Sequence, residues 1–189
     1  MASKVAFENL VAPLCRVLSV CLMALAVGCA ANPAAGLIKA AARGDTAEMQ
    51  ALLAKGVAVD ERAKTTGATA LMVAAERGYR EMVAYLLAKG ANVNAQRNDG
   101  KTALIIAASK GQLGTAHLLL DSGAAVNARE ASGGTALMAA AEFGHLDVVQ
   151  LLLAKGADVN ARAIDGNTAL SFTRQSDVKA ALMKAGAKP

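Results

Sequence analysis

Gly67-Ala68-Thr69-Ala70-Leu71 reveals how this chain folds, because its pattern Gly-x-Thr-Ala-Leu recurs three more times along the chain. Each copy begins 33 residues after the one before it, and the later ones are Gly100-Lys101-Thr102-Ala103-Leu104, Gly133-Gly134-Thr135-Ala136-Leu137 and Gly166-Asn167-Thr168-Ala169-Leu170. Self-similarity at a fixed period of this length is typical of a repeat protein, in which each unit buries its apolar face only by stacking on its neighbours.

Each unit is predicted to hold two short helices. The Thr begins the first helix, because its hydroxyl can accept a hydrogen bond from a free backbone N–H group. A glycine in the left-handed conformation ends each helix. The glycines that keep the 33-residue step are Gly78, Gly111 and Gly144 after the first helix and Gly90, Gly123 and Gly156 after the second. A Leu-Leu pair packs the second helix against the core. Helices this short are not stable alone, so they depend on contacts with the neighbouring repeats.

This unit, with Gly-x-Thr-x-Leu followed by Ala-Ala, resembles the ankyrin repeat. The resemblance implies an all-α ankyrin solenoid of helix-turn-helix units with β-turn fingers. The expected divisions are an N-terminal cap at 37–65, full repeats at 66–98, 99–131 and 132–164, and a C-terminal cap at 165–189. The family often carries Thr-Pro-Leu-His at the start of the first helix. Here Met72, Ile105, Met138 or Ser171 stands at the histidine position, so the family's histidine hydrogen bonds are missing.

The composition argues against several classes of function. The net charge is +5, and the lysines and arginines are scattered along the chain without forming a basic block. We therefore expect no contact with nucleic acid. All three cysteines lie in the first 29 residues, which excludes a Cys/His zinc site from the body of the chain. Gly100-Lys101-Thr102 looks like the end of a phosphate-binding loop, but Ala95 stands where that loop needs glycine. We therefore expect that the protein is not an enzyme and binds no cofactor or metal. We also expect it to be a monomer.

The N-terminal region has the layout of a secretory signal. Arg16 is followed by an uncharged run over 17–27, which is too short to span a bilayer, since about 20 apolar residues are needed. The run ends in Ala26-Val27-Gly28-Cys29, which resembles the lipobox of bacterial lipoproteins. The resemblance implies a signal peptide at 1–28, a lipidated Cys29 and a short tether at 29–36.

From this signal we expect the mature chain to lie on the periplasmic side of the bacterial cell envelope, anchored to a membrane by the lipid on Cys29. The residue after Cys29 is Ala rather than Asp, which by the same resemblance favours the outer membrane. Two alternatives stay open: secretion as a soluble periplasmic or extracellular protein after cleavage behind Ala30 or Ala31, and an uncleaved anchor.

The resemblance also locates a contact surface. In ankyrin proteins, partners usually contact the concave face made by the finger tips and the first helices. A first column, one residue before each glycine that ends a first helix, is Arg43, Arg77, Lys110 and Phe143. A second column, in the fingers, is Arg62, Gln96, Arg129 and Arg162, and the tip residues include Asn98, Asp99, Lys101, Ile164, Asp165 and Asn167.

Both columns are mainly basic, and Phe143 replaces a cation in the first of them. They favour a protein partner with an acidic or mixed patch, anchored on Phe143; the alternative is that the charges only keep the surface soluble. We expect a non-catalytic protein-binding module that acts as an adaptor, chaperone-like partner or inhibitor in the envelope. Other hypotheses are an envelope structural protein contacting cell wall or membrane, and an immunity or antagonist partner of a toxin.

Overall fold

A computed structural model describes residues 33–188. The predicted signal peptide, Cys29 and the first four residues of the predicted tether lie outside this range. Within it the chain forms ten helices, and the described residues contain no strand. The predicted all-α solenoid is therefore confirmed for this part of the chain.

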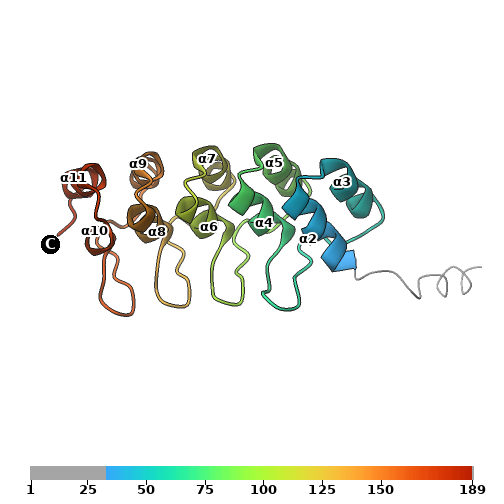
Figure 1. Cartoon of the computed structure of the whole chain (residues 1–189), viewed down its shortest axis with the longest axis horizontal. Coiled ribbons are helices and arrows are strands. Elements are labelled where there is room, and N and C mark those ends of the chain that lie inside the picture. The colour runs from blue at the N-terminus through green and yellow to red at the C-terminus, as the bar shows by residue number, and fades with distance from the viewer. Residues whose placement is uncertain (1–32, 189) are drawn as a thin grey trace, which may run out of the picture. The chain divides into compact units, whose positions relative to one another are not determined.

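The helices alternate between two layers of the stack (Figure 1). The inner layer comprises α2 (Pro33–Arg43), α4 (Ala70–Arg77), α6 (Ala103–Ser109), α8 (Ala136–Phe143) and α10 (Ala169–Phe172). The outer layer comprises α3 (Thr46–Ala54), α5 (Arg80–Ala88), α7 (Leu113–Asp121), α9 (Leu146–Ala154) and α11 (Ser176–Lys184). The segments that precede α4, α6, α8 and α10 extend away from both layers as fingers.

The repeated Thr begins the inner helices as predicted. The Oγ1 atoms of Thr69, Thr102 and Thr135 each accept a hydrogen bond from the backbone N–H three residues later, at 3.4 Å. At α10 the arrangement is reversed, because the Ser171 hydroxyl accepts from the backbone N–H of Thr168 at 2.7 Å. These bonds satisfy N–H groups that have no partner within the helix.

The glycine that ends an inner helix is required for two reasons. Gly111 has a φ of 67°, in the left-handed region, and a Cβ atom there would lie 2.6 Å from Nδ1 of His145 in the next unit. The Nε2 atom of His145 lies 3.2 Å from the carbonyl oxygen of Ser109. His145 therefore packs one repeat against the one before it, and the Gln112 side chain packs against Gly78 in the same way.

The core is one continuous apolar layer along the stack. The first Leu of each pair, Leu86, Leu119 and Leu152, is fully buried, and its neighbour is partly buried. Each such Leu stabilises the fold by about 1.5–3 kcal/mol relative to an exposed side chain. At the position of the family's histidine, the first three repeats bury an apolar side chain instead, from Met72, Ile105 and Met138.

The first helix begins earlier than the sequence analysis expects. Helix α2 starts at Pro33, so residues 33–36 form helix rather than tether. Proline suits the first position of a helix, because its fixed φ is helical and its missing N–H would have no partner there anyway. The alanines at 34 and 35 favour the same conformation.

Candidate partner-binding surface

The first predicted column lies at the C-terminal ends of the inner helices. Arg43, Arg77 and Phe143 are the last residues of α2, α4 and α8, and Lys110 is the C-cap of α6. All four side chains are exposed. Arg43 pairs with Glu48 and Lys110 with Glu76, each across 3.7 Å, whereas Arg77 forms no ion pair within residues 33–188. Exposed pairs of this kind hold their partners weakly, so the column stays accessible.

The second predicted column forms a ladder of hydrogen bonds between units. Arg62 donates through Nη2 to the carbonyl oxygen of Gln96 at 2.5 Å, and Gln96 donates through Nε2 to that of Arg129 at 3.2 Å. Arg129 in turn donates through Nη1 to the carbonyl oxygen of Arg162 at 2.6 Å. No further finger follows that of Arg162 among the described residues, and Arg162 donates to the carbonyl oxygen of Gly166 in its own finger. These side chains therefore brace the fingers, a role that the sequence analysis missed.

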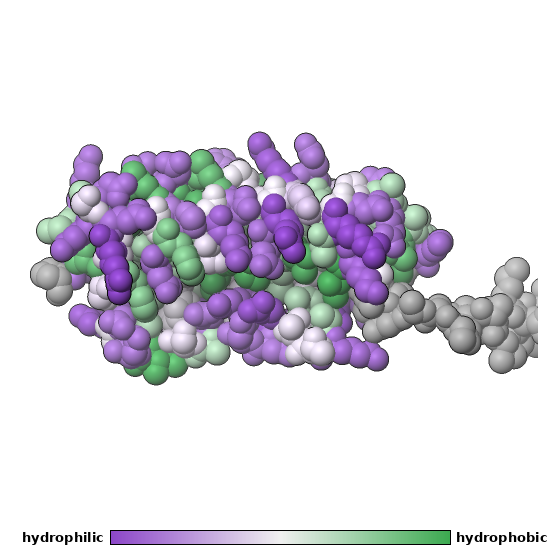
Figure 2. All heavy atoms as spheres, in the orientation of Figure 1, coloured by the Kyte–Doolittle hydropathy of each residue, from purple (hydrophilic) through white to green (hydrophobic). Residues whose placement is uncertain are grey.

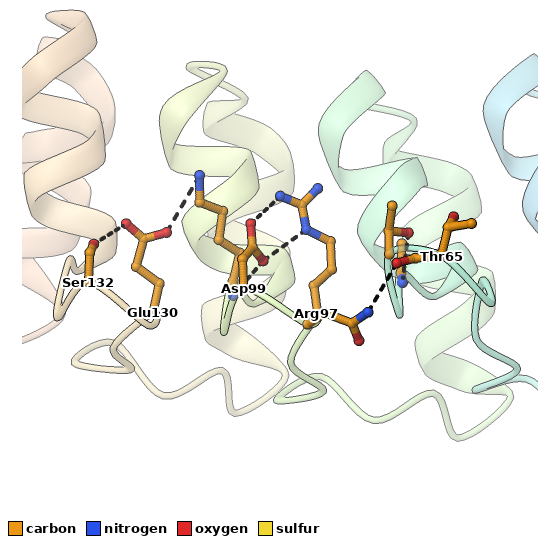
Figure 3. Close-up of polar contacts among 9 residues, drawn as sticks. Thr65, Arg97, Asp99, Glu130 and Ser132 are labelled. Atoms are coloured by element: carbon orange, nitrogen blue, oxygen red, sulfur yellow. Dashed lines mark hydrogen bonds and ion pairs between the residues drawn. The ribbon is translucent and has the colours of Figure 1, made fainter.

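The finger tips are joined by backbone contacts as well. Each finger is a turn closed by its own backbone hydrogen bond, such as that from Arg97 N–H to Lys101 oxygen at 2.9 Å. One further bond links each finger to the next: Asn98 N–H to Thr66 oxygen, Ala131 N–H to Asp99 oxygen and Ile164 N–H to Ser132 oxygen, at 2.9–3.0 Å. Asn98 adds a side-chain bond to the Thr65 oxygen at 3.1 Å (Figure 3).

Charged side chains at the central tips are tied to one another (Figure 3). Arg97 and Asp99 form a two-point ion pair, and Lys101 donates its backbone N–H to Asp99. The hydrogen bond from Arg97, with a smaller contribution from Lys101, lowers the pKa of Asp99 to about 2. The ammonium group of Lys101 lies 3.5 Å from Oε2 of Glu130, whose other oxygen accepts from Ser132 at 2.8 Å. The side chains of Asp99 and Lys101 thus already have partners within the fold, which makes them less available to another protein.

The tip of the last finger is held by hydrogen bonds and forms no ion pair within residues 33–188. Asp165 accepts two hydrogen bonds from Asn167, one from its backbone N–H at 3.0 Å and one from its side chain at 2.7 Å, and both lower the pKa of the Asp165 carboxyl. Ile164 is 79% exposed, although its backbone is bonded to the preceding finger. In Figure 2, apolar atoms gather at the tips of the fingers that lead into α8 and α10, on a face that is otherwise largely polar.

A groove of about 400 Å³ opens beside Phe143; we call it the Phe143 groove. Its floor includes Ile105 and Met138, both nearly buried, and its exposed walls are Phe143, at 56% exposure, and Ile164. A second hollow lies against Phe143 and Phe172, so the Phe143 ring contacts both hollows. The structure thus brings Phe143 and Ile164, which the sequence analysis placed in different parts of the surface, to one site.

The groove exists because one repeat has small residues at two positions. Gly134 stands where the other units have Ala68, Lys101 and Asn167. Ala139 stands where they have Val73, Ile106 and Phe172. Both small residues line the Phe143 groove. Comparison of the repeats position by position could have found this signal in the sequence.

The remaining titratable cluster lies on the outer helices. Asp121 of α7 contacts Nδ1 of His117 and Nζ of Lys155, each at 2.8 Å, and the hydrogen bond from Lys155 is the main cause of the lowered pKa of Asp121. Across residues 33–188, no three His, Cys, Asp or Glu side chains are grouped to hold a metal ion. No helix in this part of the chain is long and apolar enough to cross a membrane.

The stacked helix pairs, joined through their fingers, define a helical-repeat protein that presents side chains along one face. The family model for ankyrin repeats (3 copies) matches residues 15–97, 37–130 and 92–163. The chain belongs to the ankyrin-repeat family. Ankyrin repeats generally mediate protein–protein interaction, and proteins built from them are generally non-catalytic binding modules. A comparison with curated proteins gave no match.

Proposed function

We propose that this chain is a non-catalytic binding module of the bacterial cell envelope, which acts as an adaptor, chaperone-like partner or inhibitor of another protein. The observation that carries the proposal is the exposure of Phe143, one of only three phenylalanines in the chain. It lies at the end of α8, in the column whose other members are cations. An exposed aromatic side chain beside a groove is typical of the anchor of a protein interface.

The cations at the N-terminal end of the stack supply a second part of the contact surface. Arg77 is exposed and forms no ion pair among the described residues, while Arg43 and Lys110 have only weak, exposed partners. Charges of this kind steer a partner of opposite charge and raise its association rate more than its affinity. A partner with an acidic or mixed patch fits this arrangement.

The envelope location rests on the sequence of the N-terminal region. The lipobox-like Ala26-Val27-Gly28-Cys29 supports cleavage before Cys29 and acylation of its thiol. Acylation also removes an unpaired cysteine from an oxidising compartment, where a free thiol is reactive. A lipid at Cys29 and a tether of four residues before α2 hold the repeat domain close to the membrane surface.

The test is affinity purification with the full chain from native envelope extract. We expect one protein to be captured in stoichiometric amount by the wild type, and its yield to fall at least about tenfold for Phe143→Ala combined with Arg77→Ala. The matched control, Leu113→Ala with Lys179→Ala, removes one exposed apolar and one cationic side chain from the outer helices. This control should capture the partner as the wild type does.

Two other outcomes contradict the proposal. Equal capture by both double variants would mean that the partner does not contact the concave face. Enrichment of peptidoglycan in place of a protein would favour an envelope structural role. Melting temperatures of both variants should stay within about 4 °C of the wild type, because exposed substitutions cost within about 0.5 kcal/mol each.

A further inference from the structure

The Phe143 groove combines an apolar interior with an acidic rim. The apolar part comprises Ile105, Met138 and Ala139 on the floor and Phe143 and Ile164 on the walls. Exposed apolar walls around a hollow favour contact with a partner, because burying them against it removes them from water.

The charged side chains around the groove are mostly carboxylates. The lining holds Lys101 together with Glu130, Glu142 and Asp165, which leaves a net charge of −2. Lys101 and Glu130 pair with each other across 3.5 Å. The uncompensated charges are therefore those of Glu142 and Asp165, both exposed and neither in an ion pair within the described residues.

The groove differs in charge from the same face of the preceding repeats, where Glu76 and Asp99, at the positions of Glu142 and Asp165, are paired with Lys110 and Arg97. Arg77 and Lys110 occupy the position of Phe143 in the preceding repeats, and Arg97 occupies the position of Glu130. A ligand that follows the cations of the first two repeats meets carboxylates at the third. The partner's chemistry must therefore change along the stack.

We propose that the Phe143 groove binds a segment of the partner in which an apolar side chain is flanked by lysine or arginine. The apolar side chain lies between Phe143 and Ile164, and the cation lies against Glu142 and Asp165. This inference rests on the proposed function and specifies what part of a partner the groove accepts. It also limits the acidic patch of that partner to the N-terminal repeats.

The test uses a phage-displayed library of random twelve-residue peptides, selected against the full chain. We expect the wild type to enrich peptides with Lys or Arg within three residues of Leu, Ile or Phe. Glu142→Lys with Asp165→Asn changes the groove from −2 to +1, while the Asn still offers an oxygen to Asn167. This variant should bind the selected peptides at least about tenfold more weakly and should enrich peptides with Asp or Glu instead.

The matched control is Glu81→Lys with Asp147→Asn, which makes the same change of charge on the first turns of α5 and α9. It should keep the wild-type preference. Phe143→Ala should weaken the binding of the selected peptides about tenfold or more, without changing which charge the groove prefers. Circular dichroism of each variant checks that the repeats remain folded.

The outcomes separate this inference from the proposed function. The inference is overturned if the selected peptides depend on Phe143 but show no preference for Lys or Arg, or prefer Asp or Glu. That result would leave intact the proposal that a partner contacts the face around Phe143. A library that yields no peptide dependent on Phe143 overturns the inference as well, whatever the envelope extract shows. Self-association of the chain that Phe143→Ala abolishes would identify a second copy as the occupant, and would also overturn it.

Discussion

The Nη1 atom of Arg129 lies 2.6 Å from the carbonyl oxygen of Arg162, one full repeat further along the chain. The same contact is made from Arg62 to Gln96 and from Gln96 to Arg129, so three side chains in one column join successive fingers. The surface that is proposed to meet a partner is therefore held in shape by its own side chains. A rigid surface loses less entropy on binding than a flexible one.

Replacing Arg129 by Ala should destabilise the fold. The substitution removes the bond to the Arg162 oxygen and a second bond to the Gly133 oxygen at 3.2 Å. Each bond contributes about 0.5–1.5 kcal/mol, so we expect a loss of about 1–3 kcal/mol in urea unfolding. Arg77→Ala is the control, because Arg77 is exposed at the end of α4 and outside this ladder. Equal losses for the two variants would argue against the ladder.

Replacing Gly111 by Ala should be more damaging than replacing Gly114. Gly111 has φ 67°, and its new Cβ would lie 2.6 Å from the His145 ring. The left-handed conformation alone costs about 1–2 kcal/mol for a residue with a side chain. At Gly114, within α7, the nearest atom is Cδ of Arg80 at 3.6 Å, and Ala stabilises a helix by up to about 1 kcal/mol over Gly. Similar free energies of unfolding for the two variants would show that the glycine is not needed for packing.

The pairing of Asp99 with Arg97 should make stability depend on pH. The pKa of Asp99 is lowered from 3.8 to about 2 in the folded chain, so the folded state binds the proton more weakly than the unfolded state. The contribution is therefore complete above about pH 5 and is lost as the pH falls from there toward 2. The difference in urea midpoint between the wild type and Asp99→Asn should shrink over this window. A difference that is the same at pH 7 and pH 3 would contradict the assignment.

The lipid anchor has a direct test. Cys29→Ser should abolish both labelling by a fatty-acid analogue and the appearance of the chain in the membrane fraction. Cys21→Ser is the matched control, because Cys21 lies inside the predicted signal peptide and is removed with it. Membrane fractionation that persists in Cys29→Ser would favour an uncleaved anchor, and a soluble wild type would favour plain secretion.

The periodic features of the fold could be predicted from the sequence because each depends on residues close together in the chain. Thr69 and Gly78 mark the ends of one helix, and their recurrence every 33 residues shows that the helices stack. The start of α2 was misplaced because the first unit lacks the Gly-x-Thr entry. Pro33 and the alanines after it carry the helix past the boundary that the repeat pattern indicates.

The candidate site was predictable only in part. The exposure of Phe143 followed from its place in a column of cations. The role of Arg129 did not, because an arginine on a finger can contact solvent, a partner or a neighbouring carbonyl, and only the spacing of the fingers decides among them. The Phe143 groove was missed because its walls come from different units and its depth depends on the absence of side chains at Gly134 and Ala139.

Photo-crosslinking in the native envelope tests whether Phe143 contacts a partner protein. Phe143 is replaced in the full chain by benzoylphenylalanine, which keeps an aromatic ring at the end of α8, and Leu113 on the outer layer is replaced as the control. We expect a crosslink to one protein from position 143 and none from position 113. Crosslinks of equal yield from both positions, or from position 113 alone, would contradict the assignment of the concave face as the binding surface.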